Sequence, residues 1–169
     1  MKSIIYKASL TFFISLCITG LLAQEIGNDA VINKLVKEYT LKKDGSYDLH
    51  VYKEVKIMSY YSFHRMFGES FIIYHPDYQT LEINKSYTIM ADGKKVVTTE
   101  NAYNKVLPRY ASKAPEFNKM REMVVTHTGL EIGATTYLDY TLHNSAEFTS
   151  ALMGNEVIRE NVPVREFKL

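Results

Sequence analysis

The 169-residue sequence contains no tryptophan, one cysteine and four prolines, and neither sign of charge is in excess. Cys17 lies in an N-terminal segment that we expect to be removed, so the mature chain has no disulfide, thiolate nucleophile or Cys-ligated metal. Lys and Arg total 20 against 19 Asp and Glu, and losing Lys2 and Lys7 with that segment keeps the balance near neutral. Nothing in this charge balance suggests a nucleic acid or an anionic surface as a partner.

Residues 1–23 have the pattern of a secretory signal peptide. Two lysines precede an apolar run over residues 8–22, and the run ends with the small residue Ala23 before Gln24. The run is shorter than the ~20 residues that span a bilayer, so we expect no membrane span after its removal. A retained N-terminal anchor is the alternative, whereas Leu16 before Cys17 argues against a lipoprotein. We therefore expect an exported protein, periplasmic or associated with the cell envelope.

The rest of the chain, residues 24–169, has the composition and pattern of a single all-β module. Thirteen Tyr and eight Phe favour β structure, because aromatic side chains suit a pleated surface. Residues 32–41 are expected to form the first strand, and an Asp-Gly turn at 43–46 leads to a second at 47–57. Lys53 interrupts the alternating apolar positions of that strand, which predicts a strand end or a bulge nearby.

A second hairpin is expected between residues 79 and 99. Its first strand alternates, with the apolar residues Leu81, Ile83, Tyr87 and Ile89 assigned to one face and the polar residues between them to the other. Asp92-Gly93 is expected to form the turn. Further strands are expected at 122–128, at 137–142 and in 156–169, where Pro163 interrupts the pattern, and residues 100–121 are expected to be a long connection.

These elements predict an antiparallel β-sandwich or an open barrel, with room for one short helix at 115–121 that Pro115 would begin. The last six residues alternate apolar and charged side chains up to Leu169. This pattern fits either a terminal edge strand or a module cut short at its C-terminal strand.

No residue is predicted to be catalytic, to bind a cofactor or to bind a metal. The histidines, among them His50, His64 and His75, form no local ligand pair. No Gly-x-Ser-x-Gly turn marks a nucleophile, and Asp139 and Glu131 are expected to be a strand-surface carboxylate and a turn residue. Asn84-Lys85-Ser86 matches the glycosylation sequon, but it lies within an expected strand.

Five stretches of the sequence resemble one known family in matching order. They are FGESFIIYHPDYQTL (67–81), SYTIMADGK (86–94), NAYNKVLP (101–108), VVTHTGLE (124–131) and GATTYLDY (133–140). Together they resemble the domain of unknown function at the N-terminus of bacterial transglutaminase-like proteins, over about residues 36–169. The resemblance implies export, an all-β sandwich and a following papain-like domain with a Cys-His-Asp triad. With no cysteine in the mature chain, no triad residue can be assigned here, and the resemblance favours a truncated or split protein.

Three hypotheses for function follow. The first is a non-catalytic exported module that packs against or positions a transglutaminase-like partner domain in the bacterial cell envelope, or binds an envelope component. The second is a stand-alone carbohydrate- or peptide-binding domain that uses surface aromatic residues, although most of the tyrosines and phenylalanines are expected in the core. The third is an enzyme with an unrecognised histidine or carboxylate site.

Overall fold

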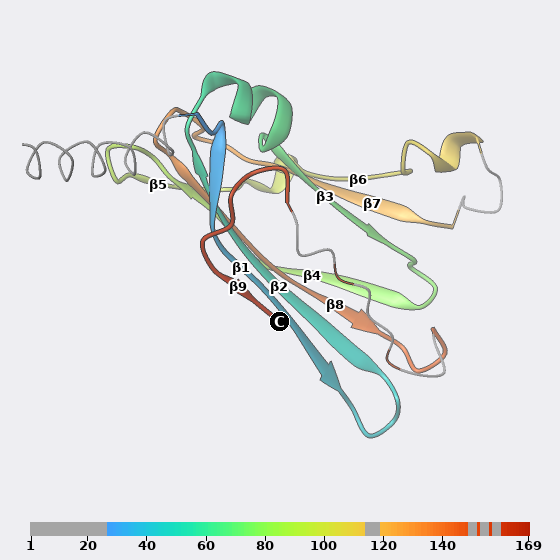
Figure 1. Cartoon of the computed structure of the whole chain (residues 1–169). Helices are drawn as coiled ribbons and strands as arrows, with labels where there is room; N and C mark the ends of the chain where they lie inside the picture. The colour runs from blue at the N-terminus through green and yellow to red at the C-terminus, as the bar shows by residue number, and fades with distance from the viewer. Residues whose placement is uncertain (1–26, 114–118, 149–151, 153–155, 157–159) are drawn as a thin grey trace, which may run out of the picture.

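The computed structural model describes residues 27–113, 119–148, 152, 156 and 160–169, which form two β-sheets packed face to face (Figure 1). The strands are β1 Ala30–Leu41, β2 Tyr47–Ile57, β3 Glu69–Tyr74, β4 Gln79–Ile89, β5 Lys95–Val97, β6 Tyr103–Val106, β7 Arg121–Thr126, β8 Thr135–Asn144 and β9 Phe167–Lys168. The expected signal peptide and most of the expected helix at 115–121 lie outside the described residues.

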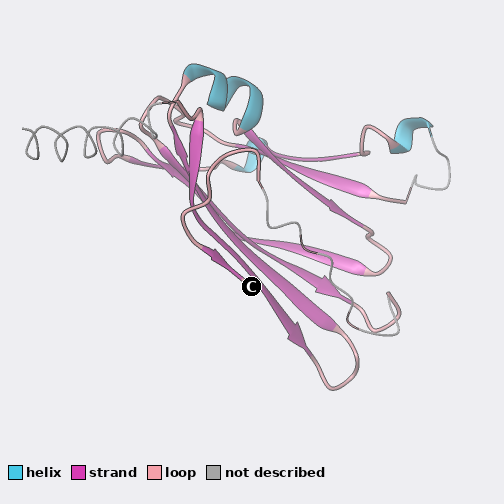
Figure 2. Cartoon of the chain, viewed as in Figure 1, coloured by secondary structure: helices cyan, strands magenta, loops and turns pink. Residues whose placement is uncertain are grey.

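One sheet has six strands in the order β5-β4-β8-β2-β1-β9, and the other has three in the order β3-β7-β6. The pairings are antiparallel apart from β1 with β9, which is parallel and brings Leu35 opposite Phe167. In Figure 2 the strands of the two sheets fan apart from one end of the molecule, and helix is confined to short turns. The predicted all-β sandwich is confirmed, and the sheets do not close into a barrel. No helix among the described residues is long and apolar enough to cross a membrane.

Both predicted Asp-Gly turns are confirmed. Gly45 and Gly93 have φ angles of 86° and 87°, which a side chain would disfavour. At the second turn the backbone N–H of Met90 donates to the carbonyl of Lys94, which joins β4 to β5.

Of the two predictions for Lys53, the strand end is wrong and the bulge nearby is confirmed. β2 continues without interruption to Ile57, and Lys53 keeps its place in an inward-facing series with Val51 and Val55. The nearby register shift lies in β1, between Ile32 and Lys34. A charged side chain therefore faces the space between the sheets, where its neighbours along the strand are core residues.

The assignment of faces in β4 is correct for its first half and wrong for its second. A bulge between Ile83 and Lys85 reverses the alternation, because it adds one residue to β4 opposite β8. Ser86 and Thr88 are therefore buried. The Tyr87 ring instead stacks on Tyr137, with ring centroids 4.6 Å apart.

Residues 100–121 are not only a connection, as predicted, because they contain strand β6. This strand pairs with β7 from Tyr103 opposite Val125 to Val106 opposite Glu122. The inner faces of both sheets supply the core, and its main clusters are Ala30, Ile32, Leu35, Val51, Val55, Ile57 and Val162, and Ile72, Val125 and Leu138.

Candidate functional site

A cavity of about 470 Å³ lies between the two sheets, and we refer to it as the inter-sheet cavity. Apolar side chains from β1, β2, β3 and β8 form much of its wall, namely Leu35, Val51, Val55, Ile72 and Leu138. Polar and charged groups also line it, among them Lys53, Ser70, His127 and Glu160. An apolar pocket of this size with a few convergent polar groups is typical of a small-molecule site.

Lys53 is the charged group on the β2 wall of this cavity. Its Nζ is 4.0 Å from Oε2 of Glu160 and 5.6 Å from the centre of the Phe67 ring. Burial lowers the pKa of the Lys53 amine; the Glu160 carboxylate acts in the opposite direction, and Lys37 adds to the lowering. The amine therefore lies in a partly desolvated position with one distant counter-ion.

Ser70 and His127 form a hydrogen-bonded pair on the opposite wall. Ser70 Oγ lies 2.9 Å from Nε2 of His127, which is 6% exposed. Burial, and secondarily the charge of Lys53, lowers the pKa of His127 to about 4, so the imidazole is neutral near pH 7. Its Nδ1 has no hydrogen-bond partner within the part of the chain that is described.

The Ser-His contact alone does not make a catalytic centre. A serine nucleophile needs a base that a third group orients, together with donors for the oxyanion. The Nδ1 atom of His127 would have to contact such an orienting group, and none is present among the described residues. The arrangement is suited to binding, since it offers cationic side chains, a hydroxyl and apolar walls.

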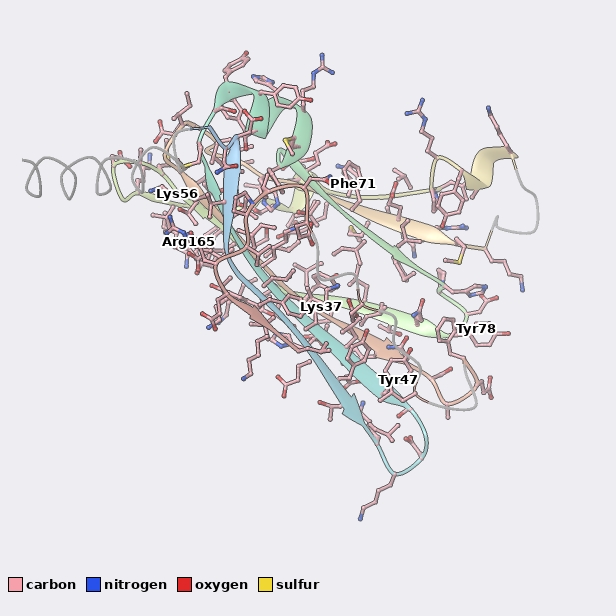
Figure 3. The ribbon with its side chains drawn as sticks, viewed as in Figure 1. Lys37, Tyr47, Lys56, Phe71, Tyr78 and Arg165 are labelled. Carbon is pink, nitrogen blue, oxygen red and sulfur yellow. The ribbon has the colours of Figure 1, made fainter. Side chains whose placement is uncertain are left out.

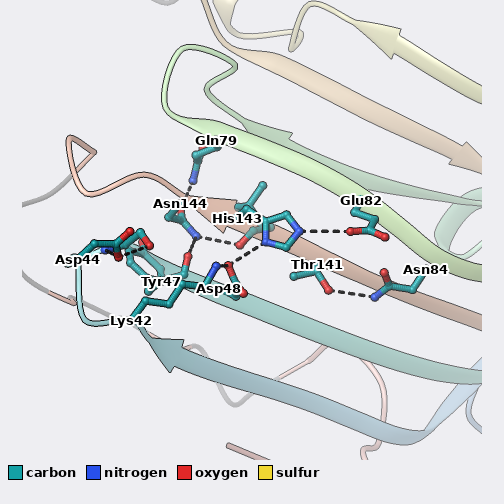
Figure 4. A network of polar contacts seen from close by, with 12 residues as sticks. Lys42, Asp44, Tyr47, Asp48, Gln79, Glu82, Asn84, Thr141, His143 and Asn144 are labelled. Atoms are coloured by element: carbon teal, nitrogen blue, oxygen red, sulfur yellow. Dashed lines mark hydrogen bonds and ion pairs between the residues drawn. The ribbon is translucent and has the colours of Figure 1, made fainter.

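A separate network of polar residues covers the outer face of the six-stranded sheet (Figure 4). His143 contacts Asp48 through Nδ1 at 2.8 Å and Glu82 through Nε2 at 3.3 Å. The hydrogen bond to Asp48 is the main cause that raises the pKa of His143. These residues are partly solvent-exposed and bridge β2, β8 and β4, so the network is explained as a set of cross-strand contacts.

The residues considered as candidates from sequence do not converge on the inter-sheet cavity. His50 contacts Asp139 at 2.8 Å on the outer face, and Asn84 of the sequon donates to the same carboxylate at 2.9 Å. The His64 ring packs against Tyr60 at a tilt, with ring centroids 4.1 Å apart. Glu131 accepts a hydrogen bond from the backbone N–H of Ala91. The described residues contain no group of three or more His, Cys, Asp or Glu placed to hold a metal ion.

Sequence reasoning missed the residues that do line the cavity. Ser70 and His127 are 57 positions apart, so no local spacing connects them. Lys53 is recognisable in the sequence as the single charge in an apolar series. That pattern predicts a strand end or a bulge equally well, so it does not by itself indicate a site.

The outer side of the three-stranded sheet carries exposed apolar side chains, which we call the outer apolar face. It comprises Phe71 and Ile73 of β3, Val124 of β7 and Val106 of β6, placed together by the strand register. Phe71 is 59% exposed and Ile73 and Val106 are each 40% exposed. Figure 3 shows Phe71 on this smaller sheet.

The fold and these features define an open, two-sheet β-module with a lined cavity between its sheets. The family model "Domain of Unknown Function with solved-structure structure (DUF3857)" matches residues 43–169. The chain therefore belongs to this family, and the predicted resemblance is confirmed to that extent. The transglutaminase-like partner that the resemblance implied stays a prediction.

Several solved structures are similar to the chain. A crystal structure of a "putative protease" from Parabacteroides distasonis shares 45% identity at a TM-score of 0.80, over 82% of this chain. The match covers 28% of that protein's length. The CBM3a-L domain with flanking linkers from scaffoldin cipA of the Clostridium thermocellum cellulosome shares 14% identity at a TM-score of 0.36, over 69% of this chain and 68% of that one, which is too low to support an argument. No curated protein matched.

Proposed function

We propose that this chain is a non-catalytic exported module that packs against and positions a transglutaminase-like domain in the bacterial cell envelope. The observation that carries the proposal is the outer apolar face, where Phe71, Ile73 and Val106 are exposed together on one side of a small sheet. Contiguous exposed apolar side chains on a folded domain mark an interaction surface, because their burial is favourable.

The composition of this face suits an interface between domains. Phe71 lies beside Val124, which has Asn104 on its other side, and Glu122 of the central strand β7 lies between Ile73 and Val106. Apolar residues beside polar ones are typical of protein interfaces. The Parabacteroides relative supports a domain as the occupant, because most of its chain lies outside the matched region.

The chemistry of the inter-sheet cavity supports the non-catalytic part of the proposal. His127 has no orienting partner among the described residues, and the mature chain that we expect contains no cysteine. A papain-like reaction would therefore need a nucleophile from the partner domain.

The docking proposal predicts that Phe71→Ser combined with Ile73→Ser weakens binding to a transglutaminase-like domain by about 30-fold or more. Such a loss is expected when a central aromatic anchor and its neighbour are removed from an interface. Isothermal titration calorimetry of the purified protein against the non-matching part of the Parabacteroides relative measures it.

Val97→Ser is the matched control, because Val97 is 63% exposed on β5, in the other sheet. This variant should bind as the unmodified protein does. Equal affinity of the unmodified protein and the double variant, or no binding by the unmodified protein, would contradict the proposal.

A second candidate function is the binding of carbohydrate through aromatic side chains. Tyr60 and Tyr61 are 64% and 57% exposed beside the helical turn Ser62–Met66. Exposed tyrosine rings can stack on sugar rings. Titration with soluble cell-wall glycans, followed by tyrosine fluorescence, would favour this function if the change saturates and is lost in Tyr60→Ser.

A further inference from the structure

We infer that the inter-sheet cavity binds a small molecule with an apolar body and a single carboxylate, and that Lys53 holds the carboxylate. This inference goes beyond the docking role and does not depend on it. Of the outer apolar face, Phe71 also lines the cavity, whereas Ile73, Val106 and Val124 do not.

Lys53 occupies a position where the strand pattern calls for an apolar residue. Val51 and Val55, its inward-facing neighbours in β2, are 5% and 4% exposed. A charged amine in such a position costs free energy unless it is paired. Its described counter-ion, Glu160, is 4.0 Å away, which is too long for a hydrogen bond, so within the described part of the chain the Nζ protons are left to contact an anion.

The charges around the cavity favour an anion with one negative charge. Lys37 also lines the cavity, but its amine is already paired with Glu156. Arg65 is a further cation of the lining. The carboxylates of Glu69 and Glu160 offset the charges of Lys53 and Arg65, and they would repel a ligand with several negative charges. One carboxylate therefore fits better than a phosphate dianion.

Ser70 and His127 provide a second polar contact for the ligand. When neutral His127 carries its proton on Nε2, it donates to Ser70 Oγ at 2.9 Å. The Ser70 hydroxyl is then free to donate its own proton to a carboxylate oxygen. Because His127 is neutral, this pair adds a hydrogen bond without adding charge.

The walls beyond these groups suit an aliphatic or aromatic body. Leu35, Ile72 and Leu138 are each at most 5% exposed and line the cavity. The volume of about 470 Å³ lies within the usual range for small-ligand pockets. Burial of an apolar chain against these side chains would supply affinity, and the carboxylate would supply selectivity.

Octanoate is a suitable probe, with octanol as its uncharged counterpart. Titration of the ¹⁵N-labelled protein by NMR should show saturable shifts at Lys53, Ser70 and His127 with octanoate. Lys53→Met keeps the length of the side chain and removes the charge, and it should weaken octanoate binding by about tenfold or more. Octanol binding should change by no more than about twofold in the same variant.

Lys85→Met is the matched control, because Lys85 is an exposed lysine of β4. It should bind octanoate with unchanged affinity, and Lys53→Gln serves in place of Lys53→Met if the latter does not fold. Equal octanoate binding by Lys53→Met and the unmodified protein would overturn the inference, as would the absence of saturable shifts at the cavity residues. Ile73→Ser with Val106→Ser changes the outer apolar face at residues that do not line the cavity. This variant should bind octanoate normally while its docking is weakened, so the two results are separable.

Discussion

Replacing Gly68 by alanine is expected to destabilise the protein by about 3 kcal/mol or more. A Cβ atom at this position would lie 2.2 Å from the backbone oxygen of Phe63, far inside the distance that two such atoms tolerate. The backbone oxygen cannot rotate away as a flexible side chain could, so the helical turn Ser62–Met66 or the start of β3 must move. Urea unfolding followed by circular dichroism measures the loss.

The substitution should also disturb the contact between the segments before β3 and after β7. The carbonyl of Gly68 accepts a hydrogen bond from the backbone N–H of His127 at 2.9 Å, which joins the segment before β3 to the segment after β7. Gly27→Ala is the control, because no atom lies within 4 Å of a Cβ built there, and its effect should stay within about 0.5 kcal/mol. Equal stabilities of the two variants would show that the contact with Phe63 relaxes at little cost.

Acid is expected to destabilise the protein through His127 well before most carboxylates are protonated. Burial lowers the pKa of His127 from 6.5 in an unfolded chain to about 4 in the folded protein. As pH falls from 6.5, the unfolded state therefore binds the extra proton first. The contribution of His127 to stability is complete above about pH 6.5 and falls by about 3 kcal/mol by about pH 4.

The glutamine variant of this histidine isolates the effect. His127→Gln keeps an amide that can contact Ser70 but does not titrate. The free energy of unfolding of the unmodified protein should therefore fall relative to that of the variant as pH falls from about 7 to about 4.5. Urea unfolding at each pH measures this difference. A constant difference for His127→Gln would contradict a buried neutral imidazole.

Local sequence signals predicted the hairpins well. Asp-Gly pairs require a positive φ that few other residue pairs accommodate, so the turns at Gly45 and Gly93 could be placed from two residues each. The alternation of Leu138, Tyr140 and Leu142 likewise gave the inward face of β8, because a strand without a bulge keeps its period of two.

The incorrect predictions concern interactions between distant residues. The bulge at Asn84 is set by the register of β4 against β8, so the alternation in β4 alone could not show that Ser86 turns inward. Strand β6 has an exposed face that includes Asn104 and Val106, and its sequence therefore has little apolar pattern. The candidate site likewise could not be predicted from local sequence, because its residues come from distant segments. Lys53 lies in β2, Ser70 in β3 and His127 in the segment after β7.

The strand order also determines when the sheets can form. β8 lies between β2 and β4, and β7 lies between β3 and β6, so each sheet acquires a central strand after both neighbours have been synthesised. Until residues 135–144 are available, β2 and β4 would each have one unpaired edge, and such edges promote aggregation. Pairings over these sequence distances fold slowly, because much chain entropy is lost before the contacts form. The order of the strands thus delays completion of the six-stranded sheet until residues 135–144 have been made, which keeps the preceding strands unpaired for longer during synthesis.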